Sequence, residues 1–145
     1  MAGSNLSQRS HVMDLAAANA VFERVLAPWV RELGLVVEEV SPEATVLMLP
    51  DAARLKHSGG VVCGQVLMAA ADSAMVVAFS AALGGFRPMT TVNLNATFLR
   101  PISHGDMRVR ARVVRTGKSL MYGDVDIVTA DGKVAVHATS TYALV

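Results

Sequence analysis

Asp72 is the one formally charged residue in the stretch from Gly59 to Gly85, GGVVCGQVLMAAADSAMVVAFSAALGG. An ionised carboxylate without a partner is costly to bury. The side chain is therefore either held by hydrogen-bond donors or faces a cleft, where it becomes a candidate general base or nucleophile. We predict a functional role for Asp72. The alternative is a structural role, in which the carboxylate bonds a nearby backbone end or an arginine of the sheet.

Gly64 and Gln65 stand at the predicted start of the helix that carries Asp72. The first N–H groups of a helix have no intrahelical acceptor, and the helix dipole favours negative charge there. Such an end can stabilise a developing oxyanion, and Gly64 has no side chain to obstruct a carbonyl group. Gln65 lies two turns before Asp72 on the same helix face. Cys63 precedes the helix, but no His and Asn partner set accompanies it, so we favour an inert thiol over a nucleophile.

Further polar residues accompany this helix start. His57 and the pair Gly59-Gly60 lead into it, and glycine allows a backbone to approach a ligand closely. The remaining candidates lie on a polar strand face or in predicted turns, where they either contact a ligand or form ordinary solvated surface: Thr91, Arg100, His104, Arg115, Lys118 and Ser119. Because there is one cysteine and no second histidine at ligand spacing, we expect no metal and no cofactor.

The composition predicts one globular domain in a chain of 145 residues, with 52% apolar residues, 17% charged residues and a net charge of +1. Lys and Arg are not clustered, so we expect no nucleic-acid partner. A single cysteine permits no internal disulfide and is typical of a reducing compartment, which favours a cytoplasmic location. The polar N-terminus lacks the apolar core of a signal peptide. We predict a loose tail over residues 1–14 and one domain over residues 15–145.

The apolar stretch 61–86 is long enough to raise the question of a membrane span. It contains as much Ala, Gly, Ser and Met as Leu and Val, and no basic flank marks an inner end. A central carboxylate such as Asp72 would cost about 2.5–3.5 kcal/mol in a bilayer. We therefore predict a buried helix of a globular core, and no membrane partner.

The elements that position these residues follow from periodicity. Helical spacing predicts a first helix over 15–33 that Pro28 bends or splits, and a central helix over 64–83 that Gly84-Gly85 ends. In the predicted strand 89–99, strict alternation places Thr91 on the face opposite Val92 and Leu94. Hairpin signals separate the other strands, which are expected within 35–49 as a pair around Ser41-Pro42, and over 106–115, 120–129 and 133–144.

This order predicts an α+β fold, in which a curved antiparallel sheet of about six strands wraps around one long helix. The central helix is apolar nearly all round, so it must be covered on most sides. A single curved sheet does not cover every side, which predicts a partner subunit. Four side chains near Asp72 either line an apolar tunnel or pack in the core: Met68, Met75, Val76 and Phe79.

From about residue 44 to 144 the chain resembles the hotdog-fold acyl-CoA thioesterase superfamily, and within it the branch of phenylacetate-pathway thioesterases. The resemblance rests on the element from Gly60 to Asp72, on the strand that ends in Phe-Leu-Arg-Pro, and on the Gly-Asp, Gly-Lys-Ser and Asp-Gly-Lys turns. The chain departs from the family where it has Cys63-Gly64-Gln65 in place of the frequent His-Gly-Gly. It also has His57 where the family often has Asn or Gln.

The resemblance implies a role for each matching residue. Asp72 would be the general base or the nucleophile, and the Gly64 N–H would polarise the thioester carbonyl. His57 would orient water or the carboxylate, and Thr91 would reach the site of a neighbouring subunit. We further place Gln65 in the catalytic set, and Gly60 and Cys63 among the substrate-binding residues. The resemblance also implies coenzyme A phosphate contacts at Lys118, Ser119 and Arg100. Family members usually form homodimers that pair into homotetramers.

Three functional hypotheses follow. The first is a thioesterase that hydrolyses an acyl- or aryl-acyl-CoA, because a thiolate leaving group needs little acid assistance. The second is a non-catalytic acyl-CoA binding module, which the altered Cys63-Gly64-Gln65 triplet motivates. The third is an enoyl-CoA hydratase or dehydratase, which would need a histidine placed well beside the acid. The acyl group is not predicted.

Overall fold

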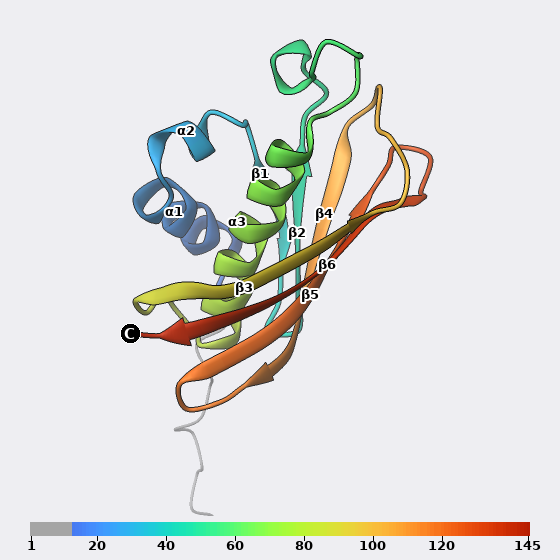
Figure 1. The fold of residues 1–145 in the computed structure, drawn as a ribbon. Coiled ribbons are helices and arrows are strands. Elements are labelled where there is room, and N and C mark those ends of the chain that lie inside the picture. The colour runs from blue at the N-terminus through green and yellow to red at the C-terminus, as the bar shows by residue number, and fades with distance from the viewer. Residues whose placement is uncertain (1–12) are drawn as a thin grey trace, which may run out of the picture.

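The structure, a computed structural model, describes residues 13–145 (Figure 1). A single antiparallel sheet of six strands, in the order β1-β2-β4-β5-β6-β3, wraps around the long helix α3 (Gly64–Ala82). This confirms the predicted α+β architecture. The strands are β1 (Val36–Val40), β2 (Ala44–Leu49), β3 (Met89–Phe98), β4 (Met107–Thr116), β5 (Leu120–Val128) and β6 (Val134–Leu144).

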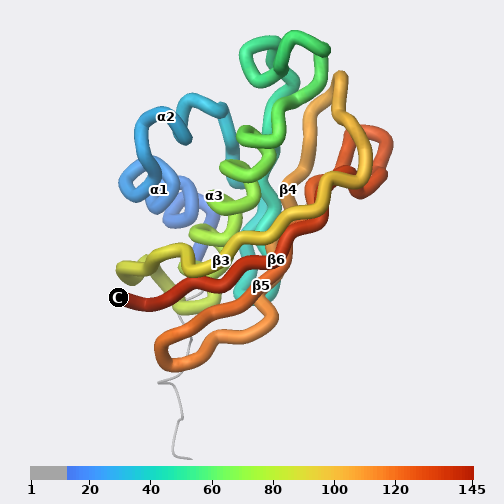
Figure 2. Tube along the Cα trace, viewed as in Figure 1, coloured from blue at the N-terminus to red at the C-terminus, as the bar shows by residue number. Residues whose placement is uncertain are grey.

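Helix α3 forms the centre of the molecule. The sheet covers one side of it, and α1 and α2 lie on the other side (Figure 2). The helix ends where Gly84 takes a φ of 77°, a left-handed conformation that glycine adopts without strain. By length and composition α3 is apolar enough to cross a membrane, but 72% of the relevant window is buried inside the fold. This burial is typical of a core helix, as the sequence predicts.

The predicted first helix is split in two, α1 (Leu15–Val25) and α2 (Pro28–Arg31), with Pro28 in the first turn of α2. This division follows from the missing N–H and fixed φ of proline. The domain begins slightly earlier than predicted, since Met13 is buried and the Asp14 side chain accepts a hydrogen bond from the Ala17 N–H. The rest of the predicted tail, residues 1–12, lies outside the described residues.

Strand β3 contains a β-bulge that changes which side chains face α3. Thr91 pairs with Tyr142 of β6, whereas Asn93 pairs with the preceding residue Thr141, so Val92 is the extra residue. The prediction of strict alternation is therefore wrong at this point. The bulge turns Thr91 toward α3, on the same face as Leu94, and leaves the Val92 side chain 59% exposed.

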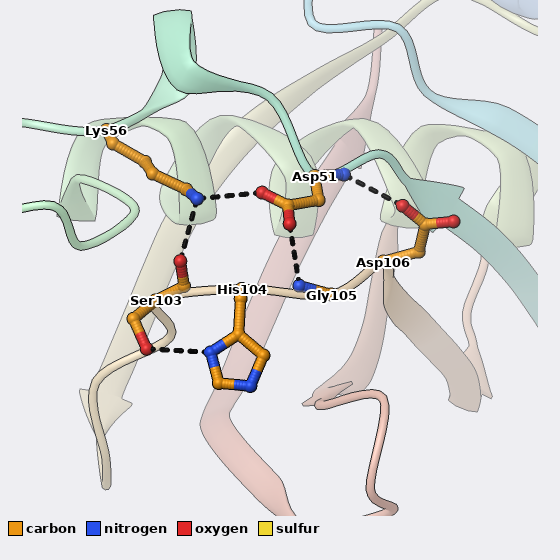
Figure 3. A network of polar contacts seen from close by, with 6 residues as sticks. All are labelled: Asp51, Lys56, Ser103, His104, Gly105 and Asp106. Atoms are coloured by element: carbon orange, nitrogen blue, oxygen red, sulfur yellow. Dashed lines mark hydrogen bonds and ion pairs between the residues drawn. The ribbon is translucent and has the colours of Figure 1, made fainter.

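Two loops near the start of α3 are joined by polar contacts (Figure 3). The Asp51 carboxylate accepts from the Lys56 ammonium at 2.8 Å and from the Gly105 N–H at 2.8 Å. Lys56 also donates to the Ser103 carbonyl, and Asp106 accepts from the Asp51 N–H. These contacts fix the segment after β2, which contains the 3₁₀ turn η1 (Ala53–Leu55), against the loop that precedes β4.

Candidate active site

A groove of about 840 Å³ runs along one side of α3, between α2 and β3. On α3 it is lined at helical spacing by Gly64, Gln65, Met68, Ala69 and Asp72, which share one face of the helix. The opposite walls are mainly apolar. Among the described residues that line the groove, Asp72 is the one with a formal charge.

The Asp72 carboxylate is half-buried and is held through one of its two oxygens. Oδ1 accepts a hydrogen bond from the Tyr142 hydroxyl at 2.5 Å and another from the Thr91 hydroxyl at 3.0 Å. Within residues 13–145 no hydrogen-bond donor contacts Oδ2. The partners are thus two neutral hydroxyl groups, neither the backbone end nor the arginine of the structural alternative. One carboxylate oxygen remains available to a molecule in the groove.

Tyr142 lies on β6 beneath Asp72, and only 2% of its surface is exposed. Its ring packs against Phe79 of α3 at a centroid distance of 5.3 Å. The Tyr142 hydroxyl also lies 3.0 Å from the backbone carbonyl oxygen of Asp72, so its single proton is shared between that oxygen and Oδ1. Burial, followed by the charge of Asp72, raises the pKa of the Tyr142 hydroxyl well above its usual value. The phenol therefore remains a neutral donor.

Helix α3 begins at Gly64, with Cys63 as its N-cap residue. In the part of the chain that the structure describes, no side chain caps this end, so its first N–H groups remain available to a ligand. A Cβ atom added at Gly64 would lie 3.6 Å from the Phe98 ring, in ordinary contact, and would occupy space in the groove.

Gly64 and Asp72 of one chain are too far apart to act on the same carbonyl group. They are eight positions apart on α3, which corresponds to a rise of about 12 Å. The N–H of Gly64 points away from the helix body, so an oxygen bound there lies about 3 Å further off. In the reaction, the distance from the carboxylate oxygen of the base, through the attacking water and the carbonyl carbon, to the carbonyl oxygen is at most about 7 Å. This distance is shorter than the separation of the two groups in one chain.

His57 does not line the groove. Its Nδ1 accepts a hydrogen bond from the Gly59 N–H at 2.9 Å, which folds the ring back onto its own loop. Gly60 completes this loop with a φ of 75° and donates its N–H to the His57 carbonyl. Gln65 does line the groove, as predicted from its helix face, and Cys63 is half-buried beside it.

Thr91 donates a hydrogen bond to Asp72 of its own chain. That Thr91 also reaches the site of a neighbouring subunit stays a prediction. Lys118 and Ser119 lie in a separate pocket at the β4–β5 turn, which shares no lining residue with the groove. Arg100 is closer to the groove. It lines a pocket that also contains Gly64 and Phe98, two residues of the groove wall.

Several residues of the site were not indicated by the sequence pattern. Tyr142 is an ordinary aromatic residue of a predicted strand, and only its inward-facing position could have suggested contact with the central helix. Trp29 is 60% exposed and lines the groove from α2. Of the four candidates for an apolar tunnel, Met68 and Val76 line the groove, whereas Met75 and Phe79 are fully buried in the core.

Comparison with known proteins now identifies the family. The family model described as "Thioesterase superfamily" matches residues 59–136, which include the start of α3, Asp72 and the strands β3 to β5. The chain belongs to the thioesterase superfamily.

Relatives of this thioesterase-superfamily chain agree with the assignment. "Putative esterase Ta0293" of Thermoplasma acidophilum is 29% identical over 122 residues, which cover 79% of this chain and 86% of the relative. The solved structure of thioesterase HI1161 from Haemophilus influenzae has a TM-score of 0.81 at 23% identity and covers 91% of this chain and 90% of its own. The E. coli PaaI protein from the phenylacetic acid degradation operon has a TM-score of 0.78 at 19% identity, with coverage of 90% and 91%. These likenesses confirm the hotdog fold.

Proposed function

We propose that this member of the thioesterase superfamily is an acyl-CoA thioesterase whose reacting group is Asp72. The observation that carries the proposal is that Asp72 lines a groove otherwise formed by uncharged and mostly apolar residues, while its Oδ2 has no hydrogen-bond donor among residues 13–145. A groove of this kind suits an apolar acyl or aryl-acyl group whose thioester is brought to a single carboxylate.

The chemistry needs little beyond one carboxylate and one oxyanion site. Oδ2 either removes a proton from a water that attacks the carbonyl carbon, or attacks that carbon itself to form an anhydride that water opens. In both cases the C–S bond breaks, and coenzyme A leaves as a thiolate that is protonated in water. No general acid is required, in keeping with a site that offers one carboxylate.

The oxyanion donor that fits best is the Gly64 N–H of a second copy of the chain. Asp72 and Gly64 of one copy cannot reach a common carbonyl group, whereas the start of α3 from one copy can meet Asp72 of another. The free edge of β3 supports such pairing, because this ten-residue strand ends the sheet with Val92 and Phe98 exposed. The proposal thus includes a homodimer or a larger homo-oligomer.

For coenzyme A itself, the pocket that contains Gly64 and Arg100 adjoins the groove, since both are lined by Gly64 and Phe98. Arg100 also lines the next pocket, together with His104 and Lys133. Arg100 and Lys133 offer cationic groups for the phosphates next to the groove. Lys118 and Ser119 can serve the same purpose only from another copy, since their pocket is separate within one chain.

The experiment that tests the proposal is Asp72→Asn, assayed by release of free thiol from a panel of aliphatic and aromatic acyl-CoAs. We expect kcat to fall about 10²- to 10⁴-fold, the range for loss of a positioned base. Asp126→Asn serves as the control and leaves turnover unchanged. Asp126 is likewise a half-buried aspartate, paired with His137. Unchanged turnover in Asp72→Asn would contradict the proposed mechanism.

The same panel separates the rival functions. A binding module would bind acyl-CoA tightly without releasing thiol, and the altered Cys63-Gly64-Gln65 triplet is the observation that favours it. A hydratase would convert an enoyl-CoA without breaking the thioester. His57 bonds its own loop and does not line the groove, which disfavours the hydratase function.

A further inference from the structure

We propose that Tyr142 is a positioning residue, which holds Asp72 by its Oδ1 atom so that Oδ2 faces the groove and performs the reaction. The inference rests on the proposed function, because it concerns the orientation of the group that reacts. Tyr142 itself does not line the groove.

The contacts around Asp72 restrict its rotation from two directions. Tyr142 and Thr91 both donate to Oδ1, and the Tyr142 hydroxyl also reaches the backbone carbonyl of Asp72. Hydrogen bonds to a charged acceptor are stronger than those between neutral groups, and the Tyr142 hydroxyl donates to the Asp72 carboxylate. Because both donors use the same oxygen, the carboxylate is anchored while its second oxygen stays free.

The sheet brings the two donors together. Strands β3 and β6 lie side by side (Figure 1). Thr91 and Tyr142 are directly paired across them, and both hydroxyls bond Asp72 of α3. Without the bulge at Val92, Thr91 would point to the outer face of the sheet. The bulge therefore completes a pair of hydroxyl donors beneath one carboxylate.

The tyrosine ring itself is fixed. It is almost fully buried and packs against Phe79, so the hydroxyl cannot turn away to water. Its raised pKa keeps the hydroxyl protonated over the working pH range, so the phenol remains a donor throughout. Orientation of this kind contributes to rate because a reacting group gains from being held in attacking geometry.

The variant Tyr142→Phe tests the inference, because it removes the hydroxyl and keeps the ring against Phe79. We expect kcat to fall about 10- to 100-fold, in line with the loss of a hydrogen bond to a charged group, while KM changes less than about twofold. The acid limb of the pH–rate profile should move to higher pH, since the ionised carboxylate loses a donor. Circular dichroism and thermal melting establish that the variant is folded.

A double variant distinguishes positioning from general damage to the fold. If Tyr142 acts through Asp72, adding Tyr142→Phe to Asp72→Asn causes little further loss of turnover. An equal loss in both backgrounds shows a merely structural role and overturns the inference.

Should Tyr142→Phe fail to fold, site-specific 3,5-difluorotyrosine at this position keeps the ring and the hydroxyl. This more acidic phenol is a stronger donor, so the acid limb should move to lower pH, and an unmoved limb overturns the inference.

The two proposals fail in different ways. If Asp72→Asn retains full turnover, the proposed function fails, and the positioning role fails with it. If Asp72→Asn is inactive while Tyr142→Phe keeps the wild-type kcat and pH profile, only the positioning role is overturned.

Discussion

Two aspartates of this chain hold their charge in different ways. Both oxygens of Asp51 are bound, one by the Lys56 ammonium and one by the Gly105 N–H (Figure 3). Asp72 has only neutral hydroxyl donors, and both bond the same oxygen. A carboxylate with every oxygen occupied joins two segments, whereas one with a free oxygen beside a groove is available for chemistry.

Asp51→Asn should destabilise the protein in a pH-dependent way. The Lys56 ammonium and then the Gly105 N–H hold the pKa of Asp51 below its usual value of 3.8. The unfolded chain therefore binds more protons than the folded chain as pH falls below 3.8. The stabilisation is complete above that pH and is lost as pH falls through the lower folded-state pKa.

Thermal melts from pH 7 to pH 2 measure this effect. We expect the Tm of Asp51→Asn to lie a few degrees below the wild-type Tm at neutral pH, since the Asp51–Lys56 pair is only partly buried. The difference should shrink below pH 3.8. The exposed Glu39→Gln serves as the control with no such trend. A Tm difference that is constant over the whole pH range would contradict this account.

At the scale of elements, the position of α3 depends on a close approach to the sheet at Gly123 of β5. A Cβ atom at this position would lie 2.4 Å from the Met75 methyl group and 2.5 Å from the Arg112 carbonyl oxygen. The first neighbour is the end of a flexible side chain, but the second is backbone of the adjacent strand β4. Glycine is therefore needed here for space between packed elements.

Gly123→Ala should destabilise the fold by about 1–3 kcal/mol, the usual cost of forcing extra atoms into a packed core. Urea unfolding measures the change. Thr139→Ala, on the neighbouring strand β6, is the control with a smaller expected effect. An unfolding free energy of Gly123→Ala equal to the wild-type value would show that helix and sheet move apart without cost.

At the scale of the whole molecule, the described fold leaves one long strand edge uncovered. β3 ends the sheet, and its exposed side chains include Val92 and Phe98. A long apolar edge strand is a template for pairing with another chain. This edge lies beside the groove, so a second copy that pairs here would also stand next to Asp72.

Val92→Lys should weaken the association of copies. A charge at this exposed edge position must be desolvated on pairing, so the mass from sedimentation velocity should fall toward that of one chain as the protein is diluted. If the second copy supplies the Gly64 N–H as oxyanion donor, kcat should fall as the copies dissociate. Val114→Lys is a matched control, because Val114 of the interior strand β4 is also 59% exposed. Equal masses for both variants at all concentrations would contradict the role of this edge.

Much of this arrangement can be predicted from the sequence, because the information is local. The period of apolar residues fixes α3 and the strands, Pro28 divides the predicted first helix into α1 and α2, and Gly84 ends α3. The charge of Asp72 stands alone in an apolar helix, which is enough to mark it as a candidate. Each of these features depends on residues within a few positions of one another.

Only the tertiary structure determines which residues contact Asp72. The bulge at Val92 depends on the pairing of β3 with β6, which no alternation within β3 reveals. The bond from Tyr142 joins residues 70 positions apart, and the pair Thr91 and Tyr142 exists only once two strands lie side by side. The separation of Gly64 from Asp72 along α3 likewise becomes meaningful only when the groove is known. Side-chain periodicity assigns a residue to a face, but the partners across that face are set by strand register and helix packing.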